Sequence, residues 1–237
     1  MKLKEALKNS TSLTTLFDLK VDEMLINLQH DQQRSRPAKT FHVSSLITES
    51  ENFCSRMKIM QYNESDEEKA KQSELSGTTR RIFYNGNIHH DKWQKLFKHA
   101  GIAEKIEVTH YSKKLHLTGT PDAIIWLWNK LYVCEIKTMR MEVFRGIKTA
   151  PKAATIQANF YMYLTGIPRA VILCDNKNDH SIKTFWLDFN PSLLYNYLSQ
   201  HDEVLKYYRA NKIPPKTCVS KKDKLAKKCK YCDYCFK

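Results

Sequence analysis

The sequence predicts an α/β domain in which helices pack on both faces of a mixed β-sheet. Segments that alternate apolar and polar residues occupy the middle of the chain, and segments with apolar residues at helical spacing lie before, between and after them. Hydrophobic residues make up 42% of the 237 residues, which is enough for one sizeable core. These observations favour a single globular α/β domain with appendages.

The sheet is predicted from segments rich in β-branched and aromatic residues. The most distinctive are AIIWLW and LYVCEIKT, which predict a hairpin that turns at Asn129-Lys130. The two segments before them are expected to pair with each other across a tight turn. The predicted strands cover residues 104–110, 113–119, 123–128, 131–138, 169–175 and 182–189.

Helices are predicted on either side of these strands. Over 78–100, apolar spacing places Trp93, Leu96, Phe97 and Ala100 on one face. Pro151 can occupy a first helical turn, so a helix is expected from there to Leu164, with Gly166 ending it. We also expect helices within 1–30, within 41–62 around Cys54, and over 191–211.

The charge of the chain favours a polyanionic partner. Lys and Arg total 39 against 25 acids, a net charge of +14, and residues 211–237 alone hold nine lysines and two aspartates. Nucleic acid is the commonest polyanion that such a surface binds. No apolar run approaches the roughly 20 residues of a membrane helix, and the start MKLKEALKNS lacks the apolar region of a signal peptide. We therefore expect a cytoplasmic DNA-binding protein without a membrane partner.

Charged residues interrupt the apolar hairpin at Asp122, Glu135 and Lys137. Because side chains alternate along a strand, Glu135 and Lys137 are expected on the same face. Two neighbouring carboxylates form a hard oxygen site of the kind that Mg²⁺ or Mn²⁺ prefers. A nearby lysine can orient a water or stabilise charge on a phosphodiester. An ion pair at the end of a hairpin is the structural alternative.

The sequence GTPD, followed by an apolar strand and EIK, resembles the motif of the PD-(D/E)XK nucleases. GNIHH (86–90) is similar to the helix histidine motif of their RecB-like branch, and QANFY (157–161) to its Gln-x-x-x-Tyr motif. The motifs occur in the family's order over about residues 78–165. The resemblance implies a restriction-endonuclease-like core at 78–190, inside a nuclease domain at 41–237 that follows a helical extension at 1–40.

By this resemblance, His89 is expected to bind the catalytic Mg²⁺ or Mn²⁺, with His90 as its competitor. Asp122, Glu135 and the carbonyl of Ile136 would be the other metal ligands. Lys137 would position the attacking water, while Gln157 and Tyr161 would hold Lys137 or the DNA backbone. Tyr161 could instead be a core tyrosine.

The cysteines fall into two groups. Cys134 and Cys174 lie in apolar strand patterns and are expected to be buried small hydrophobic residues. The other five, in polar surroundings, suggest a metal rather than disulfides in a cytosolic chain. They are Cys54, Cys218, Cys229, Cys232 and Cys235.

One subgroup of the resembled family, which includes the CRISPR adaptation exonucleases and the AddB nuclease, holds a [4Fe–4S] cluster by one early and three late cysteines. Cys54, Cys229, Cys232 and Cys235 match that arrangement best, although the late spacing departs from the subgroup's pattern. Cys218 competes: it could replace Cys232, or complete a zinc site within the tail. In each case we expect a structural clip formed by Cys54 and residues 212–237.

The resemblance implies a metal-dependent exonuclease acting on DNA ends, with single-stranded DNA the expected substrate. A structure-specific endonuclease and a non-catalytic DNA-binding module with a zinc tail are the alternatives. Repair, recombination, CRISPR or phage DNA processing would fit, the last in a host cytoplasm, and a helicase partner would be needed for unwinding because the chain has no G-x-x-x-x-G-K-[ST] loop. Arg80, Arg81, Arg145, Lys148 and Lys152 are the expected DNA contacts beside the catalytic motifs.

Overall fold

The computed structural model describes residues 13–34, 39–48, 50–64 and 76–236. Its centre is a five-stranded sheet in the order β2-β5-β6-β7-β8. Strands β6 and β7 are parallel and the other neighbours are antiparallel, so the sheet is mixed. The strands are Ala103–Ile106 (β2), Ala123–Leu127 (β5), Lys130–Met139 (β6), Arg169–Asn176 (β7) and Ile182–Asp188 (β8).

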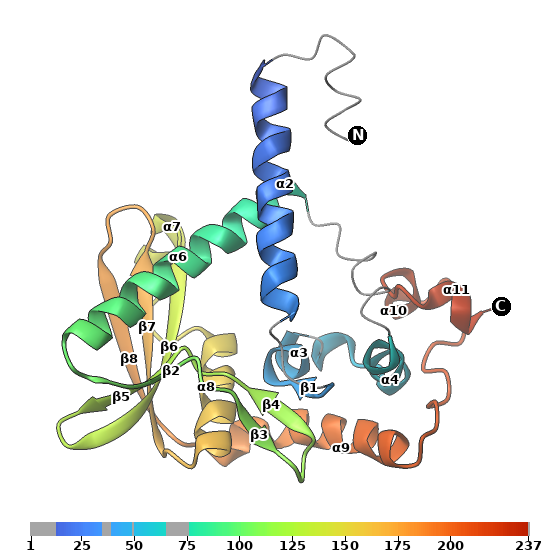
Figure 1. Ribbon diagram of the computed structural model, residues 1–237. Coiled ribbons are helices and arrows are strands. Elements are labelled where there is room, and N and C mark those ends of the chain that lie inside the picture. The colour runs from blue at the N-terminus through green and yellow to red at the C-terminus, as the bar shows by residue number, and fades with distance from the viewer. Residues whose placement is uncertain (1–12, 35–38, 49, 65–75, 237) are drawn as a thin grey trace.

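Helices cover both faces of this sheet (Figure 1). Helix α6 (Gly77–His99) packs its Phe97 against one face, where Cys134 and Ile136 of β6 meet Leu173 of β7. Helix α8 (Lys152–Thr165) packs on the other face, against the alternate residues of the same strands. The strict alternation along β6 and β7 therefore supplies two separate cores, one for each helix.

The predicted hairpin is present. Strands β5 and β6 pair antiparallel from Ala123–Cys134 to Leu127–Lys130. The two-residue loop consists of Trp128 and Asn129, with φ of 47° and 58°. Positive φ at both loop positions gives the turn the twist that suits a hairpin. The turn thus lies one residue earlier than the expected Asn129-Lys130.

The region before the hairpin differs from the expectation. Residues 104–110 do not form one strand, because Glu107 adopts a φ of 48° and divides them. The first part, β2, pairs with β5, while His110–Ser112 (β3) pairs with Leu117–Gly119 (β4). Strand β4 also pairs with Phe41–His42 (β1), giving a second sheet in the order β1-β4-β3. The tight turn consequently falls after Ser112 rather than at 111–112.

Parallel strands β6 and β7 need a crossover, and helices α7 (Met141–Gly146) and α8 provide it. Pro151 is the N-cap residue of α8, and Gly166 ends the helix with a φ of 73° in the left-handed region. Both positions agree with the sequence prediction, and both place the QANFY segment directly beneath the β6 face that carries Glu135.

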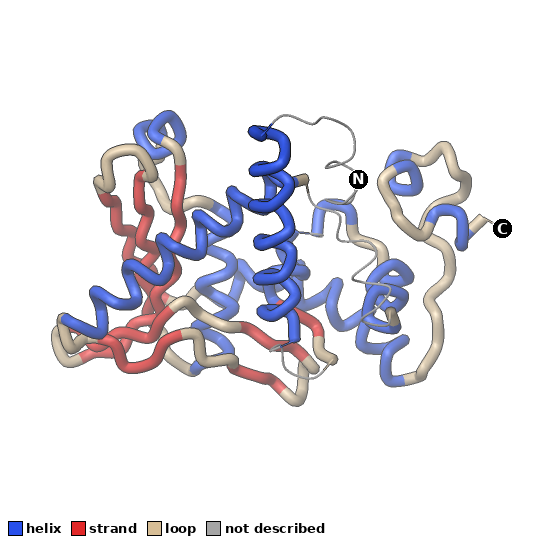
Figure 2. The backbone as a smooth tube through the Cα atoms, turned by 45° about the horizontal axis from the view of Figure 1, so that its top comes forward, coloured by secondary structure: helices blue, strands red, loops and turns tan. Residues whose placement is uncertain are grey.

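The remaining segments lie around this core. Helix α2 (Leu13–Arg34) packs on α6, and Arg81 forms an ion pair with Asp22 at 2.9 Å. Figures 1 and 2 show the Cys-rich end of the chain beside α4, although the two are far apart in sequence.

None of the helices in the described ranges has the length and apolar character needed to span a membrane. The other helices are α3 (Val43–Thr48), η1 (Ser50–Asn52), α4 (Ser55–Asn63), η2 (Pro191–Leu194), α9 (Tyr195–Arg209), α10 (Lys224–Lys227) and α11 (Cys232–Cys235).

Candidate active site

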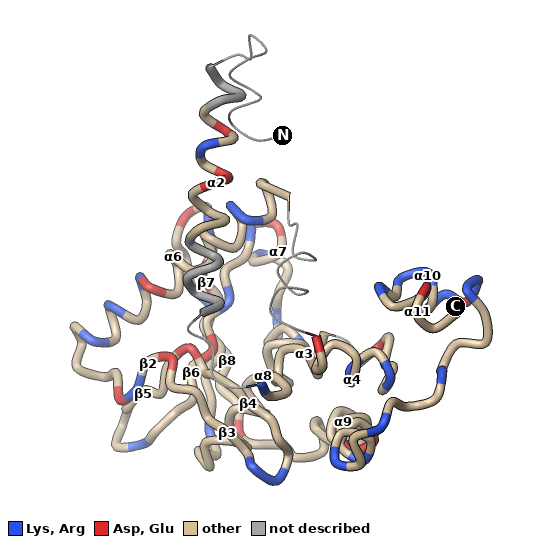
Figure 3. Tube along the Cα trace, turned by 45° about the vertical axis from the view of Figure 1, so that its right-hand side comes forward, with Lys and Arg blue, Asp and Glu red and all other residues tan. Residues whose placement is uncertain are grey.

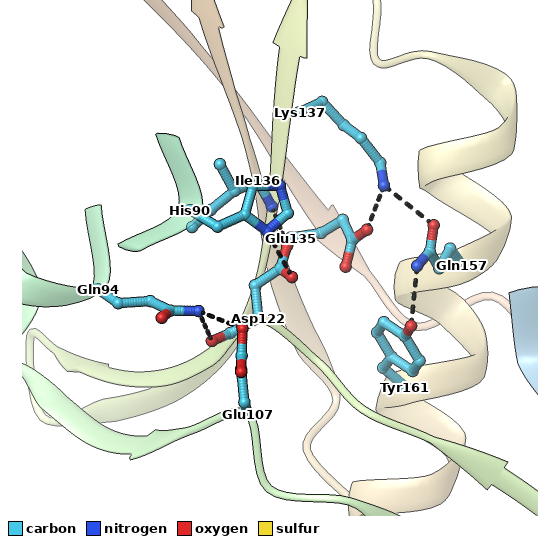
Figure 4. Close-up of polar contacts among 9 residues, drawn as sticks. All are labelled: His90, Gln94, Glu107, Asp122, Glu135, Ile136, Lys137, Gln157 and Tyr161. Carbon is cyan, nitrogen blue, oxygen red and sulfur yellow. Dashed lines mark hydrogen bonds and ion pairs between the residues drawn. The ribbon is translucent and has the colours of Figure 1, made fainter. Parts of the chain in front are cut away.

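Glu135 and Lys137 point from β6 toward α8, on the face predicted from strand alternation (Figure 4). Glu135 is 1% exposed, and its Oε1 accepts a hydrogen bond from Lys137 Nζ. The ammonium also donates to Gln157 Oε1 at 3.1 Å. Lys137 is therefore a fixed cation between a strand carboxylate and a helix amide.

Asp122 joins three elements at the start of β5. Its Oδ2 accepts from the backbone N–H of Ile136 at 2.6 Å, and its Oδ1 lies 3.1 Å from His90 Nδ1 on α6. The hairpin register makes this possible, because Ala123 is paired with Cys134 and so brings Asp122 next to Glu135 and Ile136. Asp122 and Glu135 are thirteen residues apart in sequence, and the hairpin register makes them neighbours in space.

The histidine beside Asp122 is His90, not the expected His89. Consecutive helical residues point about 100° apart, so only one of the two can face Asp122. His89 points toward the sheet and is 7% exposed, with its Nδ1 at 2.8 Å from Asp175 Oδ2 on β7. The rotation of α6 against the sheet therefore places His90, rather than His89, beside Asp122.

Gln157 and Tyr161 lie on one face of α8, as their i, i+4 spacing predicts. Gln157 Nε2 donates to Tyr161 Oη at 2.8 Å, which extends the chain Lys137–Gln157–Tyr161. Tyr161 is 5% exposed and packs against Gly119, where an added Cβ would lie 2.8 Å from the tyrosine ring. Gly119 of the GTPD motif therefore allows α8 to approach the hairpin closely.

Two supporting residues were missed by sequence reasoning. Gln94 Nε2 donates to Glu107 Oε1 at 2.9 Å and to the backbone oxygen of Asp122 at 3.2 Å. Gln94 follows His90 by four residues on α6, so its spacing from His90 on one helical face could have revealed it. Glu107 lies in the irregular link between β2 and β3, and no regular pattern pointed to it.

The electrostatics of the site favour a bound cation. Burial and the neighbouring Asp122 carboxylate raise the pKa of Glu135 to about 8, although Lys137 opposes the shift. Burial opposes charge on His90 as well, but the hydrogen bond to Asp122 raises its pKa overall. Glu135 Oε2 is buried and has no hydrogen-bond partner among the described residues. A divalent cation between the two carboxylates would satisfy that oxygen and relieve their repulsion, so the residues fit Mg²⁺ or Mn²⁺.

The five basic residues expected at DNA lie in two places. Arg80 and Arg81 lie near the start of α6, and Arg81 is paired with Asp22. Arg145, Lys148 and Lys152 are exposed along α7, the following loop and the start of α8. This second group directly follows β6, at the end of the strand nearest Lys137.

The cysteines divide as the sequence predicts. Cys134 and Cys174 are 1% and 0% exposed within the sheet. The other five, from opposite ends of the domain, line one small cavity together with Leu225 and Phe236. None of the seven cysteines, all within the described ranges, forms a disulfide. A cavity bordered by free thiols has the donor chemistry of a thiolate metal site.

The early and late segments meet at this cavity through further contacts. Cys54 is the N-cap residue of α4 rather than lying inside a helix, and its Sγ lies 3.4 Å from Thr217 Oγ1. Arg56 donates to the backbone oxygen of Pro214 at 2.7 Å, and Lys230 pairs with Glu64 at 2.9 Å. These contacts hold the tail against α4.

A scan against models of known protein families finds no match to this chain, and neither does a sequence search among curated proteins. Solved structures do match. The crystal structure of SSO0001 aligns with a TM-score of 0.54 at 17% identity, covering 80% of this chain and 87% of that chain. LHK-Exo in complex with dAMP gives a TM-score of 0.50 at 12% identity, covering 73% and 89%. A further structure, of an alkaline exonuclease (LHK-Exo) from Laribacter hongkongensis, gives 0.44 at 11% identity over the same shares, 73% and 89%.

At these identities the likeness concerns the fold. The mixed sheet flanked by helices, predicted from the sequence, is confirmed, and the chain shares this fold with the LHK-Exo structure in complex with dAMP.

Proposed function

We propose that this chain is a metal-dependent deoxyribonuclease that hydrolyses phosphodiester bonds at DNA ends. One observation carries the proposal: Asp122, Glu135 and Lys137 lie together in one cluster. Within it, the buried Oε2 of Glu135 has no hydrogen-bond partner among the described residues. A protein without a ligand for that oxygen would bear the cost of an unsatisfied buried group. A rigid strand that holds both acids and a lysine suits hydrolysis of a phosphodiester.

The ligands of the catalytic metal would be Asp122, Glu135, the Ile136 carbonyl and His90, which replaces His89 in this role. When bound, Mg²⁺ or Mn²⁺ would supply Lewis-acid stabilisation of phosphate charge. Lys137, whose side chain is 33% exposed, holds a positive charge and a hydrogen-bond donor beside the buried Glu135. Gln157, fixed by Tyr161, keeps that ammonium directed at the position where a water or phosphate oxygen would lie.

DNA as substrate is supported by charge and by a structural neighbour. The net charge of +14 suits a phosphate backbone, and LHK-Exo binds dAMP, a deoxynucleotide. Arg145, Lys148 and Lys152 are exposed and follow the end of β6 that carries Lys137, and we propose that they contact the DNA strand. We extend the proposal to single-stranded DNA ends as the substrate, and to Arg80 and Arg81 as more distant contacts.

The cysteine-lined cavity is proposed to hold a structural metal centre, a [4Fe–4S] cluster or Zn²⁺. Cys54 and three of the four late cysteines would bind it. Such a centre would fasten α4 to the tail and take no part in hydrolysis. Anaerobic purification followed by iron, sulfide and zinc analysis distinguishes the two metals, and Cys54→Ser is expected to lower the metal content of either.

The test of the function is a nuclease assay on end-labelled single-stranded, double-stranded and closed circular DNA, with Mg²⁺, Mn²⁺ or EDTA. An exonuclease is supported if linear DNA is degraded only with the metal, closed circular DNA stays intact, and Lys137→Ala degrades neither. Cutting of circles would replace it with an endonuclease using the same residues. DNA binding without any cleavage, equal in wild type and Lys137→Ala, would refute the catalytic proposal and leave a binding module.

A further inference from the structure

A second group of potential metal ligands lies on the α6 face of the sheet. His89 comes from α6, Asp175 from the end of β7, and His180 from the turn between β7 and β8. One ligand atom from each residue lies within 4.8 Å of the others. Glu135 and Lys137 project from the opposite face, toward α8, because Asp175 pairs with Thr138 and follows the alternation of Val171 and Leu173. The group is therefore distinct from the Asp122–Glu135 pair.

Asp175 is completely buried, and its two oxygens differ sharply. Oδ2 accepts from His89 Nδ1 at 2.8 Å, from Lys92 Nζ at 2.6 Å and from Trp93 Nε1 at 2.9 Å. Oδ1 is buried and receives no hydrogen bond from any described residue. The three hydrogen bonds to Oδ2 anchor α6 to the sheet, which accounts for the burial of that oxygen. The same contacts give no reason for burying Oδ1. Buried carboxylate oxygens are ordinarily satisfied, so Oδ1 points to a ligand.

His180 is held in an unusual backbone conformation beside His89. Its φ is 60°, in the left-handed region that few non-glycine residues occupy. The turn is stabilised by hydrogen bonds from the Asn176 side chain and the Ser181 backbone to Asp179 Oδ1, at 2.6 Å and 2.9 Å. The two imidazole rings lie 6.0 Å apart, centre to centre. An exposed histidine is thus presented, by a braced turn, to a buried histidine and a buried carboxylate.

We propose that His89, Asp175 and His180 bind a borderline divalent cation such as Zn²⁺. Two imidazoles and one carboxylate form a donor set for zinc and its neighbours in the first transition series rather than for Mg²⁺. Lys92 donates to Oδ2, whereas Oδ1 receives no hydrogen bond from a described residue, so the carboxylate keeps one oxygen without a donor. Exposed His180 provides the solvent side through which an ion can enter.

Occupancy would fasten the β7–β8 turn to α6. His89 precedes His90, so a metal at this site would also fix the rotation of α6 that brings His90 to Asp122. The site is formed by residues outside the Asp122–Glu135 pair, so zinc binding there does not depend on nuclease activity.

The test uses the full chain and Zn²⁺ as the probe. Wild type, His180→Asn and the control His99→Asn are stripped of loosely bound metal and dialysed against graded Zn²⁺, and the bound zinc per chain is measured. His99 is an exposed histidine at the end of α6, away from the group. Asparagine tolerates positive φ, so the first variant preserves the turn.

We expect His180→Asn to lose one equivalent of zinc, or to bind it more weakly by at least the 10- to 100-fold that loss of an outer-shell partner costs. His99→Asn should match wild type. The cysteine cavity and the Asp122–Glu135 pair contribute equally to all three proteins and cancel in the comparison. Identical zinc isotherms for wild type and His180→Asn would overturn the proposal.

Asp175→Asn provides a second measurement if its fold is retained by circular dichroism. The amide still accepts from Lys92 and Trp93 but lacks the charge that attracts a cation. Loss of the same equivalent of zinc in this variant supports the site. Full zinc binding in both variants contradicts it.

Discussion

At the residue scale, Glu135 shows a conflict between stability and the proposed function: burial disfavours its ionised form, whereas metal binding requires that form. Its carboxyl is buried next to Asp122, and its pKa is raised to about 8, so without a cation it favours the protonated form near neutral pH. Glu135→Gln resembles that protonated form. We expect cleavage to fall by at least about 100-fold, while stability in EDTA near neutral pH changes by less than about 1 kcal/mol, because the amide has the shape of the protonated carboxyl and keeps an oxygen that can accept from Lys137.

Thermal unfolding in EDTA and in Mn²⁺ checks this expectation together with the nuclease assay. Mn²⁺ should raise the melting temperature of wild type more than that of Glu135→Gln, since the amide lacks the ligand charge of the carboxylate while the other proposed metal sites are the same in both proteins. A variant that is destabilised in EDTA by several degrees would contradict our account of the unpartnered oxygen.

His89 and His90 form a natural pair of variants. His90→Ala removes a half-buried side chain next to Asp122, and we expect about 10- to 100-fold weaker cleavage or metal binding with little change in stability. His89→Ala removes a buried side chain that hydrogen-bonds Asp175, and we expect a loss of about 1–3 kcal/mol in the free energy of unfolding. Urea unfolding and cleavage rates are measured on both. The opposite assignment of effects would return the catalytic role to His89.

At the element scale, Gly119 decides how closely α8 can approach the second sheet. A Cβ there would lie 2.7 Å from the partly buried Leu164 and 2.8 Å from the buried Tyr161, so both side chains would have to move. We expect Gly119→Ala to cost about 1–3 kcal/mol and to slow cleavage, because Tyr161 holds Gln157 and Gln157 holds Lys137.

Gly86→Ala is the matched control, measured by urea unfolding beside Gly119→Ala. Gly86 lies inside α6, and apart from the backbone of that helix no described atom lies within 4 Å of the position that a Cβ would take. Alanine is the better helix former, so a gain of about 0.5–1 kcal/mol is expected. If both variants had the same effect, close approach at Gly119 would not be the reason for its glycine.

The elements also show where sequence reasoning succeeds. The β5–β6 hairpin and α8 were predictable because each has strong local signals: alternating residues around a short turn, and a proline and a glycine at the two ends of a helix. Strand alternation likewise predicted that Glu135 and Lys137 share a face. The division of 104–110 was not predictable, since it depends on the single residue Glu107 adopting positive φ.

The rotation of α6 about its own axis is a second feature that the sequence pattern did not predict. Its apolar spacing suggested Leu96 on the packed face, but Leu96 is 48% exposed, while the polar residues His89 and Gln94 are buried. Polar partners on other elements, Asp175 for His89 and Glu107 for Gln94, override the apolar pattern. Such partners lie far away in sequence, so the choice between His89 and His90 needed the tertiary structure.

At the scale of the whole molecule, the two ends of the domain meet at the cysteine-lined cavity, and the segment that closes it is strongly basic. Figure 3 shows Lys and Arg gathered along the part of the chain that carries α10 and α11. Contacts to α4 fix this segment against the body of the protein. Lysines on an ordered surface can engage a DNA backbone with a smaller loss of entropy than lysines on a free tail.

We therefore expect the tail lysines to contribute measurably to DNA affinity without touching catalysis. Lys222, Lys227 and Lys228 are exposed, whereas Lys221 pairs with Asp233 at 2.8 Å. If Lys222, Lys227 and Lys228 each neutralise one phosphate, changing all three to Ala should reduce the slope of log affinity against log salt by about 2 for single-stranded DNA. Fluorescence anisotropy in EDTA, at several salt concentrations, gives this slope without cleavage.

The matched control changes Lys95, Lys98 and Lys105, which lie on and after the far end of α6, and should leave the slope unchanged. An unchanged slope in the tail variant would mean that DNA does not reach the cysteine-rich segment and follows the α7–α8 side alone.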